Sequence, residues 1–202
     1  NFIKAIIKFI FAKWILIKPA KKKIILFDRQ SKVIFDLVFK PDHVSVLDIR
    51  YESINFYVLI DTLFKSGFRN IKKNYIVNFI NIVDPQFVFT SIDNNPFFYQ
   101  LKSLHKKPKY ISVQGAARAD PFFKICQLYK KKKIKLYADA VFVLGKVDLE
   151  KYKKVISAKY YILGSFLNNY YCDFKKTKRK RKSLVFLSSK NVTNSTQLSE
   201  EI

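Results

Sequence analysis

The sequence predicts an α/β fold, in which a Rossmann-like parallel sheet carries helices on both faces. Short apolar runs alternate with segments of helical periodicity between residues 23 and 163. Gly115, Gly145 and Gly164 each stand just past the end of such a run. Hydrophobic residues make up 49% of the 202 residues, which is enough apolar surface for the core of one full domain. Strands that alternate with helices indicate a parallel sheet, because the helices supply the crossovers.

The predicted strands are the apolar runs at residues 23–28, 44–48, 87–90, 110–113, 140–144 and 160–163. The predicted helices cover residues 31–39, 52–64, 71–83, 96–104, a segment that opens at Pro121, and residues 148–155. Ser31 is a candidate cap of the first helix, and Gly67 follows the second. Pro96 stands in the first turn of the fourth helix, where its missing N–H costs nothing.

Residues 2–17 predict an apolar helix that precedes the sheet. The segment has three lysines among apolar residues, so it is too short and too charged to span a bilayer. Two interpretations stay open. One is a helix at the membrane interface, with Trp14 and the lysines at head-group level. The other is a helix that docks on its own domain or on a further one.

Composition shifts predict the domain organisation. Residues 1–19 form the N-terminal helix, residues 20–170 the Rossmann-like domain, and residues 171–182 a polar, basic linker. Residues 183–202 begin with an apolar run that is typical of the first strand of another domain. Since the chain does not begin with Met, we expect a fragment or a processed chain.

The chain is strongly basic, with 39 Lys and Arg against 15 Asp and Glu and a formal net charge of +24. A spread positive field favours anionic partners, which include phosphates, acidic lipid head groups and nucleic acid. Basic runs at residues 130–133 and 175–182 support nucleic-acid binding as an alternative function, although such runs are usually solvated. Two widely spaced cysteines exclude a disulfide scaffold and a Cys-rich zinc site, and fit a reducing compartment.

Polar residues gather after the predicted strands, where a parallel sheet places its ligands. The candidate catalytic residue is Asp93, which would accept or orient a hydroxyl proton. The candidate substrate-binding residues are Arg50, Glu52, Asn94, Asn95, Gln114, Gly115 and Arg118. Two plainer interpretations stand beside these: Arg50 and Glu52 as a local ion pair, and Asn95 as a helix cap.

Several chemistries lack their sequence signature. No glycine-rich dinucleotide or P-loop fingerprint is present, and no Asp-x-Asp pair offers two carboxylates to a cation. We therefore expect neither a metal nor a cofactor. His43 and His105 show no ligand spacing and are expected to be surface residues.

The order of the motifs resembles that of the bacterial surface carbohydrate biosynthesis proteins, a family similar to GT-B glycosyltransferases. The pieces that carry the resemblance are KKKIILFD at 21–28, VLDIRYESIN at 46–55, PQFVFTSIDNN at 85–95, ISVQG at 111–115 and GSFLNN at 164–169. The family usually has Asn or His between the Gln and Gly that follow the fourth strand. This chain has Gln114 directly before Gly115.

The resemblance implies a metal-independent glycosyltransferase of cell-surface polysaccharide biosynthesis, with this chain as the acceptor-side half. The acceptor would be a sugar or lipid-linked sugar, and a nucleotide-sugar donor would bind mainly in the second domain. The fragment alone would then be inactive. It also implies a cytoplasmic protein, peripheral at the inner face of the plasma membrane. A noncatalytic membrane-associated scaffold is the remaining alternative.

Overall fold

The computed structural model describes residues 11–36, 38–50 and 53–166. The chain divides into two compact units, residues 1–171 and 172–202, and all the described residues belong to the first. The predicted linker, the predicted start of a second domain, Glu52 and the first ten residues lie outside the described residues.

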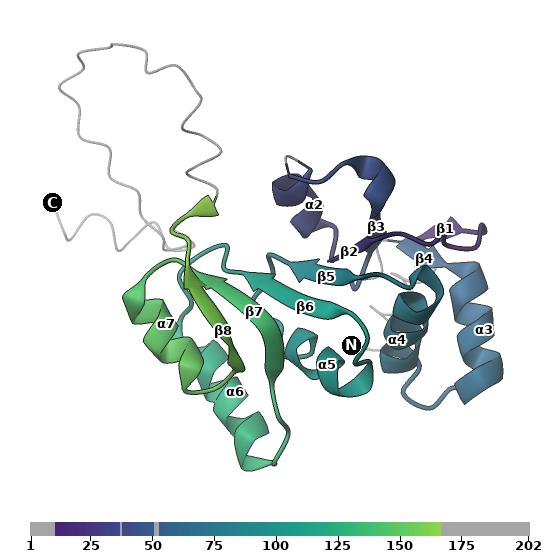
Figure 1. The fold of residues 1–202 in the computed structure, drawn as a ribbon. Helices are drawn as coiled ribbons and strands as arrows, with labels where there is room; N and C mark the ends of the chain where they lie inside the picture. Colours follow the sequence, from purple (N-terminus) through teal and green to yellow (C-terminus); the bar gives the residue numbers. More distant parts are fainter. Residues whose placement is uncertain (1–10, 37, 51–52, 167–202) are drawn as a thin grey trace, which may run out of the picture. The chain divides into compact units, whose positions relative to one another are not determined.

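The core of the fold is a six-stranded sheet in the order β3-β2-β5-β6-β7-β8, in which every neighbouring pair is parallel (Figure 1). Its strands are β2 (Ile24–Phe27), β3 (Val44–Leu47), β5 (Phe87–Thr90), β6 (Lys109–Val113), β7 (Tyr137–Val143) and β8 (Ser157–Ile162). The predicted parallel α/β sheet is confirmed.

The helices are α2 (Gln30–Phe35), α3 (Phe56–Ser66), α4 (Ile71–Val83), α5 (Leu101–Leu104), α6 (Asp120–Lys131) and α7 (Lys146–Lys153). Short 3-10 turns, Pro41–His43 and Phe98–Gln100, precede β3 and α5. Gly67 ends α3 with a φ of 60°, a left-handed conformation that favours glycine. The helix predicted at residues 71–83 has the bounds of α4.

The two faces of the sheet are covered unequally, because side chains of successive strand residues point to opposite faces. On one face Ile25, Phe27 and Val88 belong to the main core, to which α3, α4, α5, α6 and α7 contribute. On the other face Ile24 and Leu26 pack against Phe35 of α2 in a smaller core. Helices therefore lie on both faces, and most of them lie on one (Figure 1).

The predicted N-terminal helix is wrong where the structure describes it. Lys13–Ile15 forms strand β1, which pairs in parallel with β4 (Ser53–Asn55) in a separate two-stranded sheet. Trp14 packs edge-on against Phe56, and the Asn55 amide donates to the Ile17 carbonyl at 2.8 Å. These contacts come from residues about 40 positions along the chain, so the local apolar pattern did not reveal the strand.

Further helix boundaries differ from the prediction. The fourth predicted helix, 96–104, is a 3-10 turn at Phe98–Gln100 followed by α5, so Pro96 precedes it instead of standing in its first turn. Ser31 does not cap α2 from outside; it lies inside the helix, where its hydroxyl donates to the Phe27 carbonyl at 3.2 Å. The second predicted helix begins only at Phe56, because residues 53–55 are taken up by β4. Asn55 caps that helix, since its side chain accepts from the Val58 N–H at 3.0 Å.

Among the residues that the structure describes, no helix is both long and apolar enough to cross a membrane.

Candidate functional site

The candidate site lies at the carboxyl edge of the sheet, between β2 and β5. The strand that follows β2 in the large sheet, β3, lies on one side of β2, and the next, β5, lies on its other side. This reversal of strand order creates a topological switch point. Open α/β sheets form their binding crevices at such points. A cavity of about 390 Å³ lies here, lined by Gln30, Ile34, Arg50, Ser91, Ile92, Asn94 and Arg118.

Arg50 is held on one wall of this cavity by a buried carboxylate. Asp28, 1% exposed, directly follows β2 and has a φ of 85°, a left-handed conformation that is rare outside glycine. Its Oδ2 lies 2.8 Å from Arg50 Nε, and Arg50 Nη2 donates to Gln30 Oε1 at 2.9 Å. The Gln30 backbone N–H in turn donates to Asp28 Oδ1 at 3.0 Å. This ring of contacts fixes the direction of the Arg50 guanidinium.

Ser91, which lines the cavity, is joined across the switch point to Ser31 of α2. The Ser31 hydroxyl accepts from the Ser91 backbone N–H at 3.0 Å, and the two hydroxyl oxygens lie 3.1 Å apart. Both residues are buried. The first turn of α2 is therefore attached directly to the end of β5.

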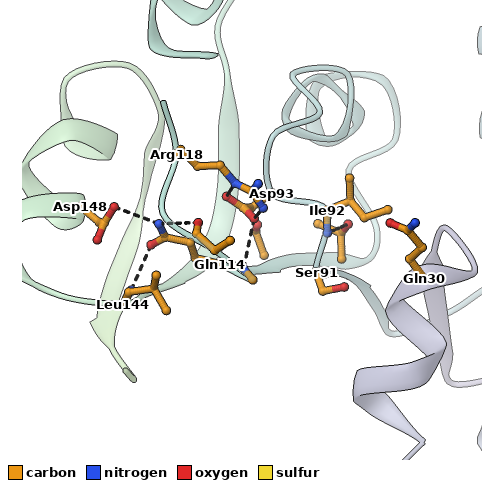
Figure 2. Close-up of polar contacts among 12 residues, drawn as sticks. Gln30, Ser91, Ile92, Asp93, Gln114, Arg118, Leu144 and Asp148 are labelled. Carbon is orange, nitrogen blue, oxygen red and sulfur yellow. Dashed lines mark hydrogen bonds and ion pairs between the residues drawn. The ribbon is translucent and has the colours of Figure 1, made fainter. Parts of the chain in front are cut away.

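Arg118 is held on the opposite wall by Asp93, which is fully buried. Arg118 Nε donates to Asp93 Oδ2 at 2.7 Å, and Arg118 Nη2 pairs with Asp93 Oδ1, which gives a bidentate contact (Figure 2). The hydrogen bonds that Arg118 donates to the Asp93 carboxylate raise the pKa of Arg118 above its ordinary value. Arg118 therefore contributes a permanent positive charge.

Three further groups donate hydrogen bonds to Asp93, two to its carboxylate and one to its backbone carbonyl. The Gly115 backbone N–H donates to its Oδ1 at 3.2 Å, and the hydroxyl of the buried Tyr152 in α7 donates to its Oδ2. Burial and the neighbouring Asp93 carboxylate raise the pKa of Tyr152 strongly, so this hydroxyl keeps its proton. The Tyr99 hydroxyl donates to the Asp93 carbonyl at 2.9 Å.

The described residues of the predicted site fall into three groups: those at the switch-point cavity, Asn95 at another cavity, and Gln114 with Gly115, which pack around the site. Arg50, Asn94 and Arg118 line the switch-point cavity, and Asp93 lies buried against Arg118. Asn95 instead lines a neighbouring cavity, and its Oδ1 accepts from the Phe97 N–H at 3.1 Å, which closes a local turn and does not cap the 3-10 turn that follows.

Gln114 and Gly115 serve the packing around the site. The Gln114 amide donates to Asp148 Oδ1 at 2.9 Å and to the Ala116 carbonyl, and its Oε1 accepts from the Leu144 N–H (Figure 2). With 1% exposure and all these partners, Gln114 ties the end of β6 to β7 and α7. A Cβ on Gly115 would lie 3.2 Å from the Ser91 carbonyl oxygen, so glycine lets the two strand ends approach closely.

Sequence reasoning missed the contribution of α2. Gln30 and Ile34 lie one helical turn apart, and that spacing is their only signal. The left-handed Asp28, which positions Arg50, has no sequence signal of its own.

The arrangement suits a polar ligand that carries negative charge. Two guanidiniums are oriented by buried carboxylates, and the Asn94 and Gln30 amides and the Ser91 segment add hydrogen-bonding groups at the same cavity. Among the described residues, no group of three or more His, Cys, Asp and Glu could hold a metal ion.

Comparison with protein-family models, with curated proteins and with solved structures finds no match to this chain. The class of protein that the fold and the cavity define is a doubly wound parallel α/β domain with an arginine-lined crevice at its switch point.

Proposed function

We propose that the chain is the acceptor-binding half of a metal-independent, GT-B-like glycosyltransferase of cell-surface polysaccharide biosynthesis. The observation that carries the proposal is the switch-point cavity with its two oriented guanidiniums, Arg50 and Arg118. Such a pair suits the phosphate of a lipid-linked sugar, and the amide of Asn94 suits sugar hydroxyls.

The role that the geometry supports for Asp93 is that of a positioning residue for Arg118. Both carboxylate oxygens already accept hydrogen bonds from Arg118, and Gly115 and Tyr152 take up further lone pairs. A catalytic base needs an accessible oxygen within reach of the substrate hydroxyl. The base role for Asp93 stays a prediction, and the donor site would lie outside the residues of this domain.

The test is ligand binding by the whole chain, measured by isothermal titration calorimetry with a sugar 1-phosphate and with the same sugar lacking phosphate. We expect the phosphate form to bind more tightly. Asn94→Ala should weaken it about fivefold, since one hydrogen bond is worth about 1 kcal/mol. Asn81→Ala, an exposed change on α4, is the control and should bind like the unaltered chain. No binding of either ligand at millimolar concentration would overturn the proposal.

A second candidate function is nucleic-acid binding, because five lysines gather at the opposite edge of the sheet. A cavity of about 820 Å³ at the amino ends of β7 and β8 is lined by Lys130, Lys133, Lys135, Lys153 and Lys154, among other residues. Filter binding of RNA at two salt concentrations separates the candidates, because contacts to phosphates weaken steeply with salt.

A further inference from the structure

The end of α3 and the loop that leads to α4, residues 64–70, present two phenylalanines to solvent, and we call this segment the α3–α4 turn. Phe64 is 88% exposed and Phe68 is 83% exposed, and every residue from 64 to 70 is exposed. Gly67, between them, has a left-handed φ of 60° that reverses the chain. Large apolar side chains are seldom left this exposed in a group, and such patches mark surfaces that bind a partner or a membrane.

The phenylalanines are surrounded by positive charge. Lys65, Arg69 and Lys73 are exposed on the same turn and at the start of α4. Asp61 is the only acidic residue between positions 56 and 83, and it pairs with Lys65 at 2.6 Å. Helix α4 packs beside α3 (Figure 1). This end of the helix pair therefore has exposed cations next to an exposed apolar pair.

The turn stands next to the candidate site. A cavity of about 570 Å³ joins Phe68, Ile71 and Lys73 of the turn and α4 to Phe27, Ile49 and Asn95, which lie at the ends of β2, β3 and β5. The turn is therefore on the carboxyl edge of the sheet, the edge that carries the arginines. Most side chains that line this cavity of about 570 Å³ are apolar, so it suits a hydrocarbon chain better than a nucleobase or a sugar.

We propose that the α3–α4 turn docks the protein on an anionic lipid bilayer, with Phe64 and Phe68 at the level of the acyl chains and Lys65, Arg69 and Lys73 at the head groups. Aromatic side chains with flanking cations are the chemistry of interfacial membrane binding. A second copy of the chain is disfavoured as the occupant, because two such turns would bring their positive charges together. Docking this way places the carboxyl edge of the sheet at the membrane surface.

The experiment is flotation of the whole chain with vesicles of phosphatidylcholine, with and without phosphatidylglycerol. We expect binding only to the anionic vesicles. The pair Phe64→Ser and Phe68→Ser should lower the partition coefficient by about tenfold or more, because the burial of two aromatic side chains is lost. The matched control is Ile125→Ser with Leu128→Ser, which removes an exposed apolar pair from the lysine-bearing α6 and should retain binding.

A second measurement locates the contact. An environment-sensitive dye on Ser66→Cys, in a chain with Cys172→Ser, should shift to the blue on anionic vesicles, whereas the same dye on Ser157→Cys at the five-lysine cavity should not. Equal binding by the Phe64 and Phe68 variant and the unaltered chain, or a blue shift only at Ser157→Cys, would overturn the proposal. The proposal would also be overturned if the chain bound single-stranded RNA through Phe64 and Phe68 but did not bind vesicles. Sugar-phosphate binding in solution is independent of all these outcomes, so the two proposals fail separately.

Discussion

At the scale of single residues, Asp93 connects three elements of the domain. Its carboxylate accepts hydrogen bonds from Arg118 and Gly115, which follow β6, and from Tyr152 in α7. A buried carboxylate with no partners would be strongly destabilising, so these contacts make the burial tolerable. Asp93 therefore holds the Arg118 wall of the cavity in place.

Asp93→Asn should destabilise the fold by about 3 kcal/mol, because it leaves the largely buried Arg118 guanidinium without its counter-charge. Urea unfolding followed by circular dichroism measures this loss. Asp84→Asn is the control, since it removes the counter-charge of an exposed lysine, Lys107, at a left-handed position that Asn also tolerates. A stable Asp93→Asn variant with a reduced transfer rate in an active enzyme would instead favour the catalytic base.

At the scale of elements, the site depends on how closely the ends of β5 and β6 approach. These strands pair from Phe87 with Lys109 to Thr90 with Ser112, and their exits then run side by side. Gly115 makes the close approach possible, because it has no Cβ to press against the Ser91 carbonyl oxygen. At this separation the Gly115 N–H reaches the Asp93 carboxylate.

Gly115→Ala should therefore cost about 1 kcal/mol or more of unfolding free energy, because the new Cβ pushes against backbone rather than against a flexible side chain. The variant should also bind the sugar 1-phosphate less well, since the Arg118 wall moves with the strand end. Gly145→Ala is the matched control: its Cβ would meet nothing within 4 Å, and its backbone is extended. A greater loss at Gly145 than at Gly115 would show that close approach is not the reason for the glycine.

At the scale of the whole molecule, the core contains several phenols. Tyr99, Tyr110 and Tyr152 are completely buried, and burial raises the pKa of each above its ordinary value. Burial also raises the pKa of Tyr75 and Tyr160. In the folded state these phenols stay protonated in alkaline solution. In the unfolded chain they ionise with the ordinary tyrosine pKa of about 10.

The contribution of these phenols to the free energy of unfolding should therefore be fully present below a pH of about 10. It should fall as the pH rises further, since the unfolded state then binds fewer protons than the folded state. Urea unfolding between pH 8 and 11 measures the slope; these values bracket the ordinary tyrosine pKa of about 10. Tyr110→Phe should make the decline shallower, and it should not destabilise the fold at neutral pH, because the Tyr110 hydroxyl is buried without a hydrogen-bond partner. An identical slope in that variant would contradict this account.

The sequence by itself determined the elements whose signals are local. The helix at residues 71–83 and the strand at residues 87–90 have the predicted bounds, because an apolar period and the turn residues Asp84 and Pro85 specify them without help from distant contacts. The alternation of such elements also determined the parallel sheet, and with it the edge at which polar strand exits gather.

Only the tertiary structure decided what lies between distant segments. Strand β1 exists because Ser53–Asn55 lies beside it, and no local pattern in residues 13–15 carries that partner. Asp93 and Asn94 are neighbours of similar size, yet one is buried against Arg118 and the other lines the cavity. The physical reason is that the direction and partners of a side chain at a strand exit depend on the elements packed around it, here α2, α7 and the end of β6, which fold back from far along the chain.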